Sequence, residues 1–267
     1  MSTPAIVGNP LREPRVILRR YTIIAIATAA VLALGKYTIV EETDWERMGS
    51  AAEIVRTTLD FLPDLAFFPQ TFLPLLETLL IALWGTVLAV IMAIPVAYLA
   101  ARNITPYPWI TYPLGRGLIV LSRSTHEIIF ALLFVSAVGL GPLPGIMALA
   151  VRSVGFMAKT TAEAIENVSP GPIEAIRATG ARPVMVFLYG VVPQVFPIFV
   201  GNAIFQLDIN IRRASILGLV GGGGIGYMFA EVMQNLRYDR AGTIVVGITT
   251  MVILGEFISN RIRNRII

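Results

Sequence analysis

Residues 174–193 read EAIRATGARPVMVFLYGVVP, a stretch that changes from a short amphipathic segment to an apolar run. Just upstream, Pro172 suits the first position of a helix, where its missing N–H costs no hydrogen bond. Glu174 in the first turn complements the helix dipole, and Gly180 permits a sharp exit. The stretch therefore predicts a short helix outside the membrane, joined rigidly at both ends to membrane-spanning segments. An ordinary loop is the alternative that this pattern leaves open.

The chain around this stretch is far more apolar than a soluble domain. Of its 267 residues, 55% are hydrophobic and 14% are charged, whereas soluble domains carry about 25% charged residues. So few charges cannot cover a surface that faces water, and we predict an all-α membrane protein. The absence of cysteine excludes disulfides and thiolate metal sites. A single histidine leaves little material for a metal centre, and we expect none.

Six stretches are long and apolar enough to cross a bilayer, which takes about 20 residues. We place these predicted spans at about 21–40, 74–101, 114–140, 146–164, 184–219 and 243–258. Between the first two, apolar residues recur at helical spacing, which is typical of a helix that lies along the membrane interface. The sequence thus predicts six transmembrane helices, with no internal repeat and no second domain.

Arginines flank the apolar region on both sides. They are Arg12, Arg15, Arg19 and Arg20 before it, and Arg261, Arg263 and Arg265 after it. This pattern favours cytoplasmic termini. The predicted division is a cytoplasmic tail (1–20), a first transmembrane helix (21–40), an extracytoplasmic connector with an interfacial helix (41–73), a membrane core (74–260) containing a cytoplasmic loop (165–183), and a basic cytoplasmic C-terminus (261–267). A nucleic-acid-binding arm is the less favoured interpretation of the basic tail.

Charged and polar side chains fall inside the predicted spans, where they are costly and usually face a cavity or a partner. Two pairs have i, i+4 spacing: Arg123 with Glu127, and Asp208 with Arg212. Arginine forks suit phosphate-like oxygens, so we predict a weakly positive path for an anion. Its candidate residues are Arg123, Ser124, Glu127, Arg152, Asn202, Gln206, Asp208, Asn210, Arg212 and Arg213. Alternatively, these residues only join helices or stabilise a dimer interface.

A run of glycines follows the fifth predicted span. GGGGIG at 221–226 formally matches G-x-G-x-x-G, but that fingerprint needs a strand before it and an acidic residue about 20 positions later. We therefore expect no nucleotide site, and the sequence contains no ATPase motif. Two interpretations stay open, a tightly packed turn at the outer mouth and a hinge or gate. The residues concerned are Gly221, Gly222, Gly223, Gly224 and Gly226.

The opening stretch resembles the EAA loop of ABC-importer permeases: Glu-Ala-Ala, three residues, Gly, nine residues, Ile, one residue, Leu-Pro. Four positions hold this pattern: Glu174, Ala175, Gly180 and Pro193. Three positions depart from it: Ile176, Gly190 and Val192. The segments RSTHEIIFALLFV, AKTTAEAIENV and RRASILGLVGGGGIG are similar to those of the phosphonate importer permease. The resemblance covers about residues 75–260.

This resemblance implies a six-span permease subunit of the type I, MetI-like fold in the plasma (inner) membrane of a prokaryote. It implies a second permease subunit as partner (a homodimer), two cytoplasmic ATPase subunits that hold the ATP and Mg, and an extracytoplasmic substrate-binding protein. The chain itself would be no enzyme and bind no cofactor, and would carry phosphonate, phosphate or phosphite. The ATPase-coupling residues by this resemblance are Glu174, Ala175, Ile176, Arg177, Gly180 and Pro193.

Three other functions compete with this one. An importer permease for another small solute would look much the same. A secondary transporter typically has paired broken helices in two related halves, and the sequence has no such halves. A membrane enzyme acting on phosphate esters needs a nucleophile with a base, or a metal cluster, for which one histidine and no cysteine offer little.

Overall fold

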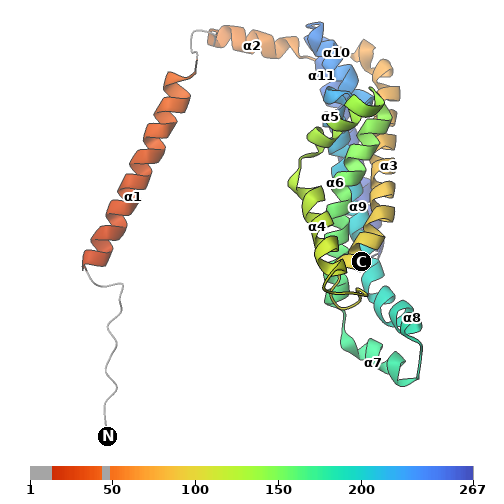
Figure 1. Ribbon diagram of the computed structural model, residues 1–267. Helices are drawn as coiled ribbons and strands as arrows, with labels where there is room; N and C mark the ends of the chain where they lie inside the picture. The colour runs from red at the N-terminus through yellow and green to blue at the C-terminus, as the bar shows by residue number, and fades with distance from the viewer. Residues whose placement is uncertain (1–13, 44–48, 267) are drawn as a thin grey trace. The chain divides into compact units, whose positions relative to one another are not determined.

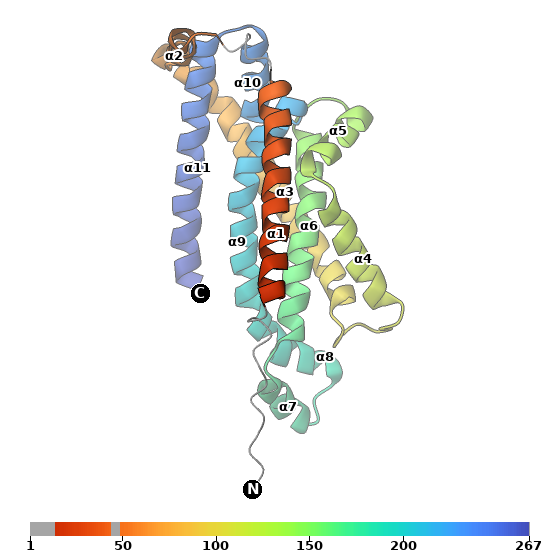
Figure 2. The same ribbon diagram turned by 90° about the vertical axis from the view of Figure 1, so that its left-hand side faces the viewer.

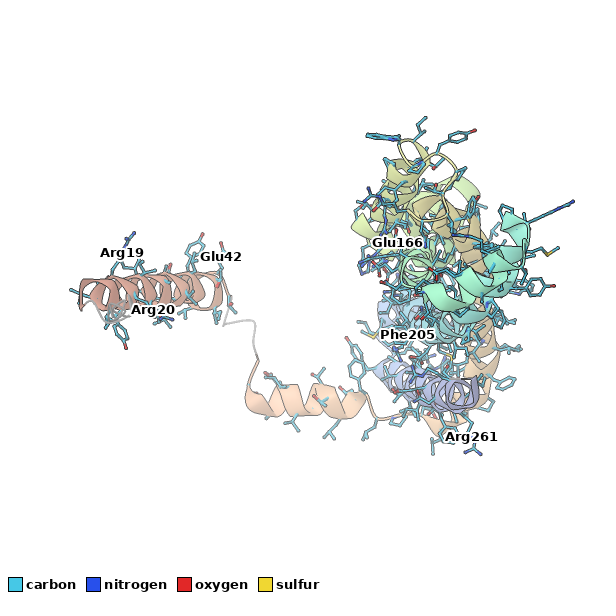
Figure 3. All side chains as sticks on the ribbon, turned by 90° about the horizontal axis from the view of Figure 1, so that it is seen from below. Arg19, Arg20, Glu42, Glu166, Phe205 and Arg261 are labelled. Carbon is cyan, nitrogen blue, oxygen red and sulfur yellow. The ribbon has the colours of Figure 1, made fainter. Side chains whose placement is uncertain are left out.

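The computed structural model describes residues 14–43 and 49–266, and every regular element in these ranges is helical. The chain divides into two units, residues 1–58 and 59–267. The first unit holds α1 (Pro14–Gly35), which continues as the π-helix η2 (Lys36–Glu41), and most of α2 (Ala51–Asp60). Arg19 and Arg20 lie near one end of the α1–η2 rod and Glu42 lies at the other (Figure 3). Residues 1–13 of the predicted cytoplasmic tail (1–20) lie outside the described residues.

Helix α2 occupies the place of the predicted interfacial helix. It begins with a capping box, in which the Ser50 N–H donates to Glu53 Oε2 at 2.7 Å and the Glu53 N–H donates to Ser50 Oγ at 3.3 Å. Its apolar side chains, including Ile54 and Val55, are exposed. The surface that these side chains present is one that a membrane interface can cover.

The second unit is a bundle in which α3, α6 and α9 run side by side (Figures 1 and 2). Helices α4 and α5 pack on α6, and α11 packs on α9 and α3. Helices α7 and α8 lie at one end of the bundle, and α10 lies at the other (Figure 2). The elements are η4 (Leu65–Phe67), α3 (Phe68–Ala100), α4 (Thr111–Ser124), α5 (Glu127–Val138), α6 (Pro142–Glu166), α7 (Pro170–Ala178), α8 (Pro183–Val186), the π-helix η5 (Phe187–Val191), α9 (Val192–Leu217), η6 (Gly218–Val220), α10 (Gly224–Gln234) and α11 (Tyr238–Ile266).

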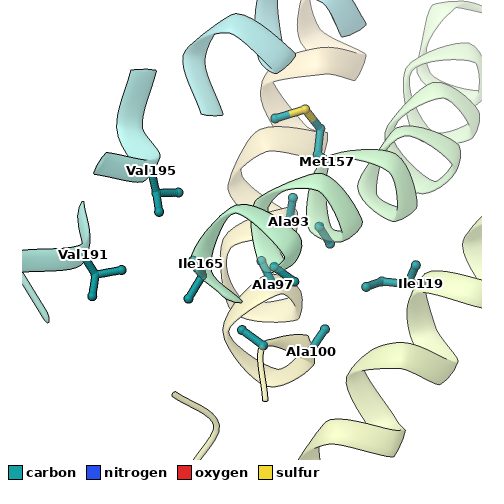
Figure 4. Close-up of a cluster of buried hydrophobic side chains, with 11 residues drawn as sticks. Ala93, Ala97, Ala100, Ile119, Met157, Ile165, Val191 and Val195 are labelled. Carbon is teal, nitrogen blue, oxygen red and sulfur yellow. The ribbon is translucent and has the colours of Figure 1, made fainter. Parts of the chain in front are cut away.

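Small residues let α3 and α6 approach closely. Ala93, Ala97 and Ala100 of α3 are at most 1% exposed, and they meet Met157 and Ile165 of α6 in one apolar cluster (Figure 4). Higher in the bundle, a Cβ on Gly85 would lie 2.8 Å from the Leu149 Cβ. Small interface residues are the usual means of packing helices in lipid, where no hydrophobic effect drives them together.

The predicted number of spans is only partly supported by the described helices. Four segments are long and apolar enough to cross a membrane, and they contain α1, α3, α9 and α11; counting the bent pair α4–α5 as one span gives five. The remaining predicted span corresponds to α6, which the same criterion does not select. Helix α6 is surrounded by α3, α4, α5 and α9, so its charged residues can face protein rather than lipid. Six spans therefore remain a prediction.

The predicted third span, 114–140, is not a single straight helix but a bent pair. Helix α4 ends at Ser124 and α5 begins at Glu127, and the two axes differ by 89°. The His126 side chain caps α5, with its Nδ1 accepting the Ile128 N–H at 3.3 Å. Because this break lies between Arg123 and Glu127, the expected i, i+4 ion pair between them does not form within the described chain.

Candidate functional site

Glu127 instead forms ion pairs with arginines from two other helices. Its Oε1 lies 3.1 Å from Arg213 Nε of α9, and its Oε2 lies 3.8 Å from Arg152 Nε of α6. The side chains of Glu127, Arg152 and Arg213 are 10%, 21% and 26% exposed. We call these three residues the Glu127 cluster. It joins α5, α6 and α9 by charge in a region where an unpaired charge would be costly.

Both arginines of the cluster approach the carboxylate through Nε. The Nε contacts are the shortest ones of each arginine with the carboxylate, and the Nη atoms of both make no hydrogen bond with the described residues. The stem of Arg123 packs over Gly155, three residues after Arg152 on α6. The Glu127 carboxylate thus lies near the guanidinium groups of Arg152 and Arg213, whose Nη donors, unbonded within the described residues, can bond to another anion.

His126 adds no metal site to the cluster. Its Nδ1 is 3.8 Å from Glu127 Oε2 and its side chain is 63% exposed. No group of three or more His, Cys, Asp or Glu residues in the described part of the chain could hold a metal ion.

Arg212 lies apart from the Glu127 cluster, although it is adjacent in sequence to Arg213. It forms the predicted pair with Asp208, with Nη2–Oδ2 at 2.7 Å and Nη1–Oδ1 at 3.3 Å. Its side chain lines an apolar cavity of about 420 Å³ between α9, α10 and α11, together with Ile216 and Phe229. Arg212 and Arg213, the two arginines predicted on α9, therefore lie on different faces of that helix.

The other polar residues predicted on α9 have different surroundings. Gln206 and Asn210 are fully buried in what we call the amide network, which also contains Thr86 of α3 and Ser153 of α6. Asn210 Nδ2 donates to Thr86 Oγ1 at 2.9 Å, and Gln206 Nε2 donates to Ser153 Oγ at 3.0 Å and to Asn210 Oδ1 at 3.0 Å. The network satisfies its own members and joins three helices, as polar side chains commonly do in membranes.

Asn202 and Ser124 join neither group. Asn202 is half-buried and makes no hydrogen bond with the described residues. Ser124 is exposed and donates to the Leu121 carbonyl at 3.0 Å. Thr86 and Ser153 were not identified from sequence, because their only signal is a hydroxyl within an apolar span; Ser153 directly follows Arg152.

The glycine turn, Gly221–Gly224, is tightly packed between helices. Gly221, Gly223 and Gly224 have φ of 93°, 78° and 69°, values that favour glycine. The Gly221 carbonyl accepts the Gly141 N–H at 3.0 Å. Two α3 side chains cap the start of α10, since Glu77 Oε1 accepts the Gly224 N–H and Thr78 Oγ1 accepts the Ile225 N–H. Neither α3 residue was identified from sequence.

Helix α7 is the predicted short helix, and it presents Glu174, Ala175 and Arg177 to solvent. Ile173 and Ile176 turn inward, because Gly190 of η5 leaves room for them: a Cβ there would lie 3.2 Å from Ile173 Cγ1 and 3.6 Å from Ile176 Cδ1.

The two ends of the α7 segment are fixed by specific contacts. Gly180 has a φ of 77° and its N–H bonds to the Arg177 carbonyl at 3.0 Å. Gln194 accepts the Ser169 N–H at 3.0 Å and donates to the Gly190 carbonyl at 2.6 Å, which ties the start of α7 to η5 and α9. Pro193 lies in the first turn of α9 rather than in α7. Gln194 was missed because it fits no pattern, although it directly follows Pro193.

The bundle and these contacts define a class of protein. Its helices are apolar towards the outside, its interior holds ion pairs, and a short helix is held rigidly between membrane-spanning elements. These are features of a multi-pass membrane transport component. Residues 85–266 match the family described as the binding-protein-dependent transport system inner membrane component, and the chain belongs to this family of transport permeases.

Two relatives are similar over most of this chain. A phosphate-import permease protein of Mycolicibacterium smegmatis is 40% identical over 191 residues, which are 72% of this chain and 36% of that protein. The chain thus spans little more than a third of that relative. A phosphite transport system permease protein of Stutzerimonas stutzeri is 40% identical over 201 residues, which are 75% of this chain and 73% of that protein.

A solved structure shares the fold. A chain from the MetNI methionine ABC transporter in an inward-facing conformation matches with a TM-score of 0.66 at 22% identity, over 76% of this chain and 99% of that one. This likeness confirms the predicted all-α, MetI-like fold. The bent α4–α5 pair and the helix α7 described above are parts of a bundle of this architecture.

Proposed function

We propose that the chain is the permease subunit of an ATP-driven importer and that it forms the path for a phosphorus oxyanion: phosphate, phosphite or a phosphonate. The observation that supports an oxyanion as the substrate is the Glu127 cluster, where the Nη donors of Arg152 and Arg213 make no hydrogen bond with the described residues. Guanidinium forks match the tetrahedral oxygens of such anions. The names of the two relatives, which refer to phosphate import and phosphite transport, point the same way.

The exposed face of α7 is the proposed docking surface for an ATPase subunit that holds the ATP and Mg. Ile173 and Ile176 against Gly190, with Gln194 across the base, supply a stiff connection from that face to η5 and α9. ATP-driven closure of two ATPase subunits would move this lever and switch the helices between inward-open and outward-open arrangements, a rigid-body change. A second copy of the chain would complete the permease.

The proposed orientation places α7 and both termini in the cytoplasm. The glycine turn and α10 lie at the opposite end of the bundle (Figure 2), where an extracytoplasmic binding protein would deliver the anion. The positive φ values at Gly221 and Gly223 suit a gate or hinge there, beside the Gly141 turn to which it is bonded.

Uptake of radiolabelled phosphate and phosphite tests this function. In cells that express the transporter with its partners, Arg152→Gln with Arg213→Gln should lower uptake by roughly tenfold or more, the effect of losing about 1.4 kcal/mol of anion binding. Arg261→Gln is the control, because Arg261 is exposed at the end of α11 (Figure 3). Undiminished uptake by the double variant, present in the membrane at normal amounts, would contradict the proposed path.

A further inference from the structure

The carboxylate of Glu127 is held only by the arginines and the imidazole around it. Within the described residues it accepts no backbone N–H; its contacts are to Arg213 at 3.1 Å and to Arg152 and His126 at 3.8 Å each. The capping of α5 is done by His126 instead. Glu127 lies in the first turn of α5, where its charge complements the helix dipole, but its carboxylate caps no N–H among the described residues, and its shortest contact is with the Arg213 guanidinium.

The carboxylate also leaves the two arginines incompletely paired. The shortest contact of each arginine is through Nε, and within the described residues neither forms a hydrogen bond with the carboxylate, whereas a bidentate pair uses two parallel N–H donors. A tetrahedral dianion has more oxygens and more charge than a carboxylate. It can therefore bond to Nε and Nη of both arginines at once, which gives it an advantage in competition for the same donors.

We propose that Glu127 is a built-in competing anion: its carboxylate occupies Arg152 and Arg213 while the path is empty, and the transported oxyanion displaces it. This inference rests on the proposed function of the same cluster as an oxyanion path. Displacement breaks and forms ion pairs only, and no covalent bond changes. The returning carboxylate then helps expel the anion, which keeps the site weak.

Weak binding is a physical requirement for conduction, because a site that holds its ion tightly cannot release it. Without Glu127, the partly buried guanidinium groups of Arg152 and Arg213 would lose their shared counter-charge, which is strongly unfavourable. Such a site would take up and retain any suitable anion. Glu127 thus keeps anion binding at Arg152 and Arg213 weak enough for the transported oxyanion to leave the site.

The direct test measures binding of radiolabelled inorganic phosphate to the purified full-length chain by equilibrium dialysis. Glu127→Gln should bind phosphate about tenfold more tightly than wild type, corresponding to removal of a competing ion pair. Glu163→Gln is the matched control: it removes the same charge from α6, in a more exposed pair with Lys159 at 3.6 Å, and should leave binding unchanged. Adding Arg213→Gln to Glu127→Gln should abolish the gain. Equal or weaker phosphate binding by Glu127→Gln overturns the proposal.

Glu127→Asp covers the case in which the glutamine variant does not fold. The shorter side chain keeps the charge but withdraws the carboxylate by one methylene, so phosphate binding should tighten by about threefold, a smaller step than full removal. Unchanged binding by a folded Glu127→Asp would then overturn the inference.

The proposed function can fail separately from this inference. If the wild-type transporter takes up no phosphorus oxyanion, the function is wrong whatever phosphate binding shows. If uptake depends on Arg152 and Arg213 but neither Glu127 variant binds phosphate more tightly, the path stands and the role given to Glu127 is wrong.

Discussion

Replacement of Asn210 by alanine tests whether the amide network is structural. The side chain is fully buried and takes part in four hydrogen bonds: with Thr86, with Gln206, and twice with Ser153. Three of these bonds join α9 to α3 or α6, and side-chain hydrogen bonds between membrane helices average about 0.6 kcal/mol, so the three amount to about 1.8 kcal/mol. We expect Asn210→Ala to lower the free energy of unfolding by that amount.

The assay is reversible unfolding of the purified chain in mixed micelles with increasing denaturing detergent. Asn202→Ala is the control on the same helix, because Asn202 makes no hydrogen bond with the described residues and should change stability by less than about 0.5 kcal/mol. The transport rate per folded molecule should survive Asn210→Ala. Equal stability of the two variants, or a lost transport rate at unchanged stability, would refute the structural role.

Three more outcomes are expected. Glu174→Lys should lower transport-coupled ATP hydrolysis by roughly fivefold or more, as loss of a charge contact at a docking face does, and unchanged coupled turnover in the folded protein would count against α7 as the docking element. Gln194→Ala should lower the number of substrate molecules moved per ATP, because Gln194 of α9 bonds both to Ser169 at the start of α7 and to Gly190 of η5. An unaltered ratio would show that coupling through α7 does not need these bonds. Gly226→Ala should reduce thermal stability by about 1–3 kcal/mol, the usual cost of overpacking, because a Cβ there collides with the Ser215 carbonyl, whereas Gly117→Ala meets nothing within 4 Å and should be neutral. A Gly226→Ala protein as stable as Gly117→Ala would contradict the close packing of α10 on the Ser215 carbonyl.

The sequence predicted those features that depend on local chemistry. Apolar composition indicated the helical membrane bundle, and Gly180 marked the exit from α7, because glycine acts on its own backbone. The predicted start was late: α7 begins at Pro170 rather than at Pro172, so Glu174 does not lie in its first turn. The Asp208–Arg212 pair formed as expected because both residues lie within α9, where i, i+4 spacing brings side chains together.

Features that depend on tertiary contacts were not predictable in the same way. The break at Thr125 and His126 has no glycine or proline to mark it, so the spacing of Arg123 and Glu127 suggested a pair that the bend prevents. Glu127 meets Arg213 from a distant part of the chain, and no local pattern encodes that contact. The polar stripe of α9 was visible in the sequence, but the partners that bury Gln206 and Asn210 lie on α3 and α6.

The most direct test of the central claim uses the absence of native cysteine. Ala175→Cys places a single thiol on the exposed face of α7 in the complete transporter, reconstituted in liposomes with known orientation. A membrane-impermeant maleimide should label it only from the side on which ATP is hydrolysed, and a bound ATPase subunit should protect it. Labelling from the opposite side, or labelling that is indifferent to the ATPase subunit, would contradict the assignment of α7 as the element through which a separate motor drives this permease.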